Sequence, residues 1–331
     1  MEGLERLNHK FWNGRNVLVT GATGLVGSWL VKDLLKLAAR VVVLVRDANP
    51  QSELYRCGDI DRLAVVNGEL DSFLDVERAI NEYDIQTILH LGAQTIVQTA
   101  HRFPLSTFEA NIRGTYNLLE ACRLHKDLVQ QIVVASSDKA YGEQASLPYT
   151  EDMPLVGRHP YEVSKSCADL LSQSYYHSYQ LPIVIMRCGN IFGGGDLNWS
   201  RIVPGTIRSF FRKENPIIRS DGKFIRDYVY VKDVARTYLF LAERLVDEKI
   251  QGEAFNFSDE SPRSVLDIVG IIQKLMGCGH MHPEILNCVQ GEIRSQYLSA
   301  EKLKKRLQWE ARFPLERAMQ ETIEWYHAFL S

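Results

Sequence analysis

The sequence lacks any apolar run long enough to cross a membrane. Its purest apolar run, Val41 to Val45, is bounded by Arg40 and Arg46. A membrane-spanning helix needs about 18 or more consecutive apolar residues. The segment Met1 to Lys10 mixes acidic and basic side chains and contains no apolar core of a signal peptide. These absences predict a soluble protein of the cytoplasm.

Cysteine is scarce, and neither sign of charge dominates. The six cysteines include no C-x-x-C pair, which excludes a disulfide scaffold and fits a reducing compartment. The formal net charge of −3 provides no overall field that favours nucleic acid or an anionic membrane. Cys278, His280, His282 and Cys288 form a cluster, but its second arm is a single cysteine, whereas zinc sites usually pair ligands on two arms. We therefore predict no metal site.

Repeats, low-complexity tracts and flexible linkers are also absent, and the first half alternates short apolar runs with helical patterns. Strands are predicted at Asn16–Thr20, Val41–Val45, Leu63–Asn67, Thr87–Leu91, Ile132–Ser136 and Ile183–Cys188, and helices at 25–37, Ser72–Asn81, Pro104–Leu124 and Tyr161–Tyr179. Wholly apolar strands separated by helices indicate a parallel sheet covered on both faces. The expected fold is therefore α/β, a doubly wound parallel (Rossmann) sheet with ligands outside the carboxyl ends of its strands.

A glycine-rich loop follows the first predicted strand directly. Glycines lie at spacings of three in Gly21-Ala22-Thr23-Gly24-Leu25-Val26-Gly27-Ser28, between a strand and a helix. Glycine permits a tight turn and brings backbone N–H groups close to a pyrophosphate, which then lies at the helix N-terminus. In this context the loop predicts a dinucleotide site. The predicted cofactor contacts in the loop are Gly21, Thr23, Gly24, Leu25, Val26 and Gly27.

Two residues after the second predicted strand bear on the choice of dinucleotide. An acidic residue there would bind the ribose 2′-hydroxyl of NAD, and an arginine would accommodate the 2′-phosphate of NADP. The sequence offers both, as Arg46 followed by Asp47. Arg46 comes first and favours NADP, but a shift of one residue reverses the answer. NAD versus NADP stays open.

The alternation weakens after about residue 190. Gly193–Gly195 and Pro204 mark loops, and helices are predicted near Val231–Leu245, Val265–Met276 and Leu315–Leu330. We predict a dinucleotide-binding domain over residues 1–189, with return elements at about 225–258. Residues 190–224 and 259–331 are predicted to form a smaller, interleaved C-terminal substrate lobe.

A phenol and an ammonium group share one face of a predicted helix, because Tyr161 and Lys165 lie four residues apart. A nearby lysine charge and a cationic nicotinamide favour the phenolate, which predicts that Tyr161 acts as a base near neutral pH. A predicted strand ends in Ser137, Asp138 and Lys139, which would point a hydroxyl, a carboxylate and an amine towards the same cleft. Together the two segments predict a catalytic site.

These motifs resemble the extended short-chain dehydrogenases/reductases, and specifically their sugar-nucleotide epimerase/dehydratase branch. The resemblance covers nearly the whole chain and is carried by the glycine loop, His90-Leu91-Gly92-Ala93-Gln94, Asn111 with Gly114-Thr115, Ser137-Asp138, the Tyr161/Lys165 pair, Arg187-Cys188-Gly189-Asn190 and Arg226-Asp227-Tyr228. Asp138-Lys139, Phe11–Arg15 and Gly194-Gly195-Asp196 look most like CDP-glucose 4,6-dehydratases. Such Asp-Lys pairs also occur in UDP-N-acetylglucosamine 4,6-dehydratases, and Arg226-Asp227-Tyr228 is closer to the general family, so the nucleotide stays open.

The resemblance implies an NDP-hexose 4,6-dehydratase, which converts a nucleotide-diphosphate hexose to its 4-keto-6-deoxy sugar by internal hydride transfer from C4 to C6. It implies a tightly bound NAD(P) that is regenerated in each turnover. In the implied mechanism Tyr161 removes the C4 hydroxyl proton, Lys165 holds the phenolate, and Ser137 hydrogen-bonds the C4 carbonyl. Protonated Asp138 then donates to the departing C6 hydroxyl.

The sequence offers three candidates for the base that removes the C5 proton. Lys139 is the positional candidate, and proximity to Lys165 would lower its pKa towards the neutral form that a base needs. Glu143 and Tyr141 are reserve candidates.

The resemblance also implies further contacts and an assembly. The implied cofactor contacts are Arg46, Asp47, Glu69, Leu70, Leu91, Gly92, Ala93, Gln94, Asn111, Tyr161 and Lys165, and the implied substrate contacts are Gln94, Ser137, Asn190, Arg201, Arg226 and Arg294. Arg226 would pair with the diphosphate through its planar guanidinium. Helices around Asn111 and Tyr161 would form the contact of a homodimer.

Two other functions remain to be weighed. An NDP-sugar 4-epimerase would use the same Tyr161 and Lys165 with the same cofactor, but such enzymes generally carry a small or apolar residue where Asp138 stands. A non-catalytic dinucleotide sensor on the same fold would be expected to lose the Tyr/Lys pair, which this chain keeps. Asp138 therefore favours the dehydratase.

Overall fold

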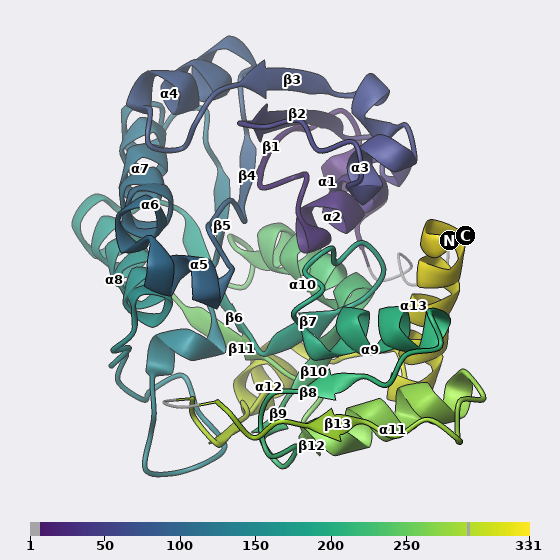
Figure 1. Cartoon of the computed structure of the whole chain (residues 1–331). Coiled ribbons are helices and arrows are strands. Elements are labelled where there is room, and N and C mark those ends of the chain that lie inside the picture. Colours follow the sequence, from purple (N-terminus) through teal and green to yellow (C-terminus); the bar gives the residue numbers. More distant parts are fainter. Residues whose placement is uncertain (1–6, 290–291) are drawn as a thin grey trace.

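A seven-stranded parallel sheet forms the centre of the computed structural model, which describes residues 7–289 and 292–331 (Figure 1). The strand order is β11-β6-β5-β4-β1-β2-β3. The strands are β1 (Asn16–Thr20), β2 (Arg40–Val45), β3 (Ala64–Asn67), β4 (Thr87–His90), β5 (Gln131–Ala135), β6 (Ile183–Cys188) and β11 (Ala254–Phe257). The order reverses between β1 and β4, and ligands of such sheets bind outside the carboxyl ends of the strands at this point. The predicted doubly wound α/β fold is confirmed.

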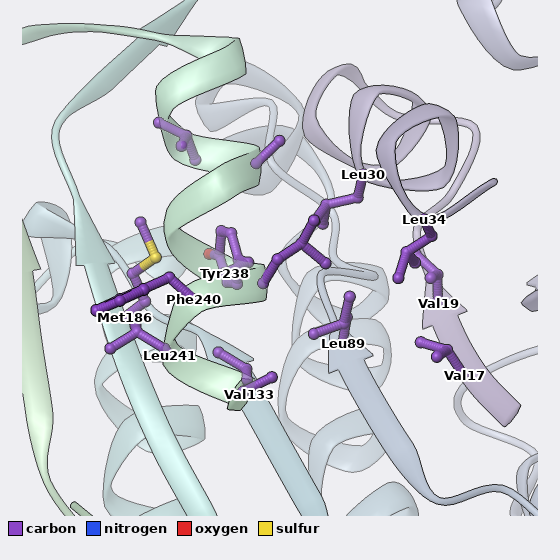
Figure 2. Close-up of a cluster of buried hydrophobic side chains, with 14 of the residues drawn as sticks. Val17, Val19, Leu30, Leu34, Leu89, Val133, Met186, Tyr238, Phe240 and Leu241 are labelled. Atoms are coloured by element: carbon purple, nitrogen blue, oxygen red, sulfur yellow. The ribbon is translucent and has the colours of Figure 1, made fainter. Parts of the chain in front are cut away.

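Helices cover both faces of the sheet because both faces are apolar. The covering helices are α2 (Leu25–Lys36) and α10 (Val231–Arg244) on one face, and α4 (Phe73–Glu82), α7 (Gly114–Leu124) and α8 (Pro160–Tyr179) on the other. Successive residues of a strand point to opposite faces. Accordingly, Val17 and Val19 of β1 lie in the cluster under α2 and α10, and Leu18 lies in the opposite cluster. Figure 2 shows the first cluster, where Leu30 of α2 and Tyr238 of α10 lie above the strands.

The predicted helices are confirmed with small shifts at their ends, including α11 (Val265–Leu275) and α13 (Leu315–Leu330). The structure differs inside the predicted helical stretch Pro104–Leu124. There α6 (Pro104–Phe108) and α7 are joined by a π-helical turn at Glu109–Arg113. Such single π turns are frequent at functional sites, and this one carries Asn111.

Pro204 does not mark a loop, so this prediction was wrong. It lies in the first turn of α9 (Ile202–Phe211), which begins after Arg201. The first N–H groups of an α-helix have no partner within the helix, so a proline there removes no hydrogen bond.

A separate hydrophobic cluster lies beyond the sheet. It is built by α9, α11 and α13 with β7 (Asn190–Phe192) and β10 (Tyr228–Tyr230). The remaining elements are α1 (His9–Trp12), α3 (Glu53–Arg56), η1 (Asp59–Arg62), α5 (Val97–Arg102), η3 (Asp138–Tyr141), α12 (Glu301–Leu307), the small sheet of β12 (Arg263–Ser264), β9 (Ile225–Arg226) and β14 (Ser295–Gln296), and the pair β8 (Ile217–Ile218) and β13 (Glu284–Ile285). Across these described residues, no helix has the length and apolar character that a membrane span requires.

A buried carboxyl group ties α1 to α10 and makes stability depend on pH. Glu243 accepts hydrogen bonds from Asn8 N at 2.8 Å and Trp12 Nε1 at 2.5 Å, and its burial raises its pKa from 4.5 to about 7. The folded state therefore holds this proton more tightly than the unfolded state. As the pH rises from about 4.5 to about 7, this group is expected to lower the free energy of unfolding by up to about 3 kcal/mol.

Glu243→Gln should remove that dependence, because the amide oxygen still accepts from Trp12 but carries no titratable proton. Urea unfolding of both proteins at several pH values between 4 and 8 measures the difference. Parallel curves of unfolding free energy against pH would contradict the assignment to Glu243.

Candidate active site

The glycine loop brings backbone unusually close to backbone at the carboxyl end of β1. Gly21 has φ +71°, and a Cβ on it would lie 2.8 Å from the amide nitrogen of Gly92. A Cβ on Gly27 would lie 2.2 Å from the carbonyl oxygen of Gly21. Gly24 caps α2 without any side-chain hydrogen bond, so the first turn of the helix keeps N–H groups available for an anion. The loop fits a dinucleotide pyrophosphate.

The end of β4 is held against the end of β1 by one hydroxyl. Thr20 Oγ1 accepts from Leu91 N at 3.1 Å and from Gly92 N at 3.0 Å, and lies 2.8 Å from His90 Nδ1. Burial lowers the pKa of His90 to about 3, so this imidazole is neutral and structural. Leu70 contacts the same place, because a Cβ on Gly92 would lie 2.6 Å from its side chain. The predicted cofactor residues Leu70, Leu91 and Gly92 therefore lie together at the carboxyl ends of β1 and β4.

Gly21→Ala is expected to destabilise the fold by about 1–3 kcal/mol and to weaken nicotinamide dinucleotide binding, because a Cβ there is strained at positive φ and clashes with Gly92. Chemical unfolding and titration calorimetry measure the two effects. Gly270→Ala is the control, since Gly270 is exposed within α11 and its Cβ would meet nothing within 4 Å. That control is expected to stabilise by about 0.5–1 kcal/mol. Equal effects of the two changes would contradict the described loop geometry.

The residues that bear on NAD versus NADP bind each other. Arg46 Nε lies 2.6 Å from Asp47 Oδ2, and both side chains are largely exposed just beyond β2. The guanidinium and the carboxylate are therefore both present at the end of this strand. Glu69, a further predicted cofactor contact, is exposed, and its N–H donates to Asp75 Oδ2 at 3.2 Å.

Asn111 joins three elements at the predicted cofactor crevice. Its side chain accepts from Gln94 N at 2.7 Å and donates to Gln94 O at 3.0 Å and to Ser164 Oγ at 2.9 Å. The π-helical turn aims this buried amide at the segment after β4 and at α8, next to Lys165. Asn111 therefore fixes Gln94 relative to the helix that carries the predicted catalytic residues.

The structure brings Ser137, Tyr161 and Lys165 together. Ser137 is the N-cap of η3, and its hydroxyl is hydrogen-bonded with Tyr161. Tyr161 and Lys165 are one turn apart in α8, and Lys165 Nζ donates to Ala135 O at 2.8 Å, at the end of β5. The Tyr161/Lys165 pair of α8 therefore lies beside the carboxyl end of β5, as the sequence predicts.

In the protein chain without a cofactor, the pKa of Tyr161 lies above its ordinary value. Burial, and next the charge of Asp138, raise it to about 12. Lys165 Nζ donates to Ala135 O at 2.8 Å, and burial lowers the pKa of Lys165 to about 8. The chain alone therefore favours a neutral phenol at Tyr161. The effect of Lys165 together with a bound nicotinamide on Tyr161 stays a prediction.

Asp138 and Lys139 begin η3 beside this group. Asp138 is 3% exposed, Ser137 Oγ donates to its Oδ1 at 3.0 Å, and burial raises the pKa of its carboxyl. Burial lowers the pKa of Lys139, as does the charge of Arg226. The predicted direction for Lys139 is therefore confirmed, but burial and Arg226 cause the shift, and Lys165 is not among its causes. An acid biased to its protonated form and an amine biased to its neutral form lie side by side.

The reserve candidates for the C5 base differ in their surroundings. Tyr141 is fully buried; its hydroxyl donates to Asn256 at 2.7 Å and accepts from Arg187 at 2.8 Å, and burial raises its pKa above the ordinary value. A phenol held this way serves the packing of the network, and the reserve role of Tyr141 stays a prediction. Glu143 follows η3 and is exposed.

Gln94 and Ser137 follow strands of the central sheet, and the other four predicted substrate residues lie on the elements beyond it. Arg201 pairs with Asp196 at 2.8 Å, and its charge is near enough to Tyr161 to lower the pKa of the phenol. Arg226 is buried, and its guanidinium donates to the carbonyl oxygens of Ile293 and Arg294 at 2.5 and 3.0 Å. In this arrangement Arg226 binds its own chain, and its contact with a diphosphate stays a prediction.

Asn190 and Arg294 are the other two predicted substrate residues on the elements beyond the sheet. Asn190 is the first residue of β7, where its N–H donates to Asp227 O at 3.1 Å, and Arg294 is exposed and pairs with Asp221 at 2.8 Å.

The sequence did not predict a role for Gln296. This residue lies in β14 and contacts both Asp138 and Lys139. Nothing in its local sequence signals this, because β14 has only two residues and its register comes from β9.

The cysteine–histidine cluster forms no metal centre in the part of the chain that the structure describes. No group of three or more His, Cys, Asp or Glu side chains gathers there in a way that could hold a metal ion. Cys278 and His280 precede β13, and Cys288 follows it.

Comparisons with known proteins identify the family and relatives of this chain. A family model described as the NAD dependent epimerase/dehydratase family matches residues 17–257. The chain is similar to the CDP-glucose 4,6-dehydratase of Salmonella typhimurium, with 29% identity over 98% of this chain and 94% of that relative. It is similar in structure to the dTDP-glucose 4,6-dehydratase from Bacillus anthracis in complex with NAD, with a TM-score of 0.84, 26% identity, and coverage of 95% and 97% of the two chains.

Epimerases are similar as well. The UDP-glucose 4-epimerase from Thermotoga maritima, solved with UDP-glucose, has a TM-score of 0.87 and 25% identity, with 96% of this chain and 100% of that chain covered. The comparisons therefore confirm the branch that the motifs resemble and include both of its reaction types. By the match over residues 17–257, the chain belongs to the NAD dependent epimerase/dehydratase family.

Proposed function

We propose that the protein is an NDP-hexose 4,6-dehydratase with a tightly bound NAD(P). The observation that supports this most is the pair Asp138 and Lys139, a buried acid and a buried amine beside Ser137 and Tyr161. Oxidation at C4 alone needs no such pair. Elimination of water needs an acid for the leaving hydroxyl and a base for the adjacent proton.

The first half of the proposed reaction uses Ser137, Tyr161 and Lys165. A bound nicotinamide would supply the hydride acceptor and later the hydride donor. Tyr161 takes the proton of the C4 hydroxyl. The Ser137 hydroxyl, which donates to Asp138 Oδ1 in the structure, would turn to donate to the developing C4 carbonyl. Lys165 supplies a fixed positive charge one helical turn away, which stabilises the phenolate when it forms.

The second half removes water from C5 and C6. The C4 ketone acidifies the C5 proton, which Lys139 accepts as the neutral amine. Asp138, whose pKa is raised by its burial, acts as the acid and donates to the departing C6 hydroxyl. The nucleotide sugar would lie between the carboxyl ends of the sheet and the proposed substrate lobe (190–224 and 259–331), where Asn190, Arg201, Arg226 and Arg294 are proposed to contact it.

The second candidate function is an NDP-sugar 4-epimerase. It is favoured by one observation, that Ser137 Oγ donates to Asp138 Oδ1 at 3.0 Å, which gives the carboxyl a local partner without any substrate. In an epimerase, Tyr161 and Lys165 would perform the same oxidation, and Asp138 would only hold Ser137 in place.

Incubation of the purified protein with CDP-glucose, dTDP-glucose, UDP-glucose, GDP-mannose and UDP-N-acetylglucosamine separates the two functions. If the protein is a dehydratase, mass spectrometry should show the loss of one water from one of these nucleotide sugars. The substrate that reacts identifies the nucleotide. CDP-glucose is the first choice, because the curated relative matched over 98% of this chain carries that name. An unchanged mass with an inverted sugar by chromatography would replace the dehydratase with the epimerase.

We also propose a homodimer. α7 and α8 pack against each other on one face of the sheet, and both expose large apolar side chains: Tyr116, Leu124, Leu170 and Tyr179. A second copy could cover these side chains. Sedimentation velocity gives the mass in solution, and a monomer at micromolar concentration would overturn the proposal.

A further inference from the structure

Gln296 reaches from a short strand outside the central sheet to the two residues that distinguish a dehydratase from an epimerase. It lies in β14, opposite Arg226 of β9, and no part of it is exposed. Its Nε2 donates to the carbonyl oxygen of Asp138 at 2.9 Å, and its Oε1 accepts from Lys139 Nζ at 2.5 Å. One amide therefore contacts both members of the pair across 157 residues of chain.

The chemistry of both contacts matches a carboxamide. The Asp138 carbonyl needs a donor, and the Lys139 side chain, which only donates when protonated, needs an acceptor. A carboxylate lacks the donor, and an ammonium lacks the acceptor. Glutamine provides one of each at the end of a side chain long enough to reach, and the two partners fix which way its amide points.

The amide also leaves the charge of the site unchanged. The charged groups that face Lys139 are Asp138 on its own turn, Arg226 from β9, Glu162 from α8 and Glu292 from the segment before β14. Arg226 is paired in register with Gln296, and Glu292 lies just before β14 in the chain. A neutral partner holds the amine in place without adding a negative charge that would keep its proton on.

We infer that Gln296 is a positioning residue for the proposed elimination, and that it holds Lys139 and the turn of Asp138 at the distance that the C5 and C6 steps require. This inference rests on the proposed dehydratase function. The first half of the reaction, which uses Ser137, Tyr161 and Lys165, does not depend on Gln296, because the side-chain hydrogen bonds of Gln296 go to Asp138 and Lys139.

Gln296→Leu tests this by separating the two halves of the reaction. The variant is expected to lower kcat for dehydration about 10- to 100-fold with little change in KM, because a small misplacement of a catalytic group costs rate. In a single turnover of this variant, reduced nicotinamide should accumulate and its absorbance should rise, because oxidation at C4 is then faster than elimination. A slowing of both halves together, without accumulation, would show a merely structural role and overturn the inference.

Gln296→Glu keeps the shape and tests the role of charge, including the case in which Gln296→Leu does not fold. Its carboxylate accepts from Lys139 and favours the ammonium, so the acid limb of the rate–pH profile should move to higher pH. Gln131→Leu is the matched control, because Gln131 is also buried, but it binds Arg15 and Thr87 at the opposite end of β5. That control should keep the wild-type kcat and pH profile.

The two proposals fail in different ways. If the wild-type protein dehydrates none of the nucleotide sugars, the proposed function is wrong. If the wild-type protein dehydrates one of them, and both Gln296 variants keep its kcat and its pH profile, the positioning role of Gln296 is wrong and the dehydratase stands.

Discussion

Tyr161→Phe is expected to lower kcat by about 10²- to 10⁴-fold, the usual contribution of a positioned acid–base group. The variant keeps the ring of α8 in place and removes only the hydroxyl that is hydrogen-bonded with Ser137. Without that oxygen nothing in this position accepts the C4 hydroxyl proton, so oxidation of the sugar stops. Single-turnover absorbance of reduced nicotinamide, with the nucleotide sugar that reacts, measures the loss directly.

The matched control is Tyr83→Phe, at the C-terminal end of α4. Tyr83 precedes β4 and so lies at the amino end of the sheet, opposite the site, and loss of its hydroxyl should leave kcat unchanged. A Tyr161→Phe protein with near wild-type kcat would remove this residue from the reaction.

Asp138→Asn is expected to abolish loss of water while oxidation at C4 continues. Asparagine has the shape of the acid and still hydrogen-bonds Ser137, but it has no proton to give to a departing hydroxyl. We expect a fall of about 10²- to 10⁴-fold in product formation, together with accumulation of reduced nicotinamide. Stopped-flow absorbance and mass spectrometry of the quenched mixture measure the two quantities in one experiment.

Asp152→Asn serves as the control for this change, since Asp152 is exposed in the turn before α8 and its carboxylate accepts a hydrogen bond from Thr150. It should dehydrate the sugar at the wild-type rate. Full dehydratase activity in Asp138→Asn would return Asp138 to a structural role and favour the epimerase, in which the carboxyl only holds Ser137.

Local patterns in the sequence were sufficient to predict the sheet and the first half of the site. Wholly apolar runs such as Val41–Val45 form strands because they are buried on both faces, and the Gly21–Gly27 spacing marks a strand–loop–helix turn. Tyr161 and Lys165 share a helical face by their spacing alone. These features are determined within a few residues, so a single sequence shows them.

The second half of the site depends on contacts between distant segments. Gln296 and Arg226 lie in strands of two residues each, whose register no local pattern sets. The raised pKa of Tyr161 in the chain alone and the cause of the shift at Lys139 could not be predicted, because burial outweighs the neighbouring charges that the sequence displays. The π-helical turn at Glu109–Arg113 is likewise not signalled by the local sequence, and Asn111 within it hydrogen-bonds Gln94 and Ser164, which lie farther along the chain in either direction.

Transfer of a labelled hydrogen within one sugar tests the dehydratase most directly. The protein would be given its nucleotide sugar with deuterium at C4, and the product would be examined by mass spectrometry and NMR. The dehydratase predicts a product that has lost one water and carries the deuterium at C6, because the hydride leaves C4 and returns to C6 of the same molecule. A product of unchanged mass, with the deuterium still at C4 and that carbon inverted, would contradict the dehydratase and establish the epimerase.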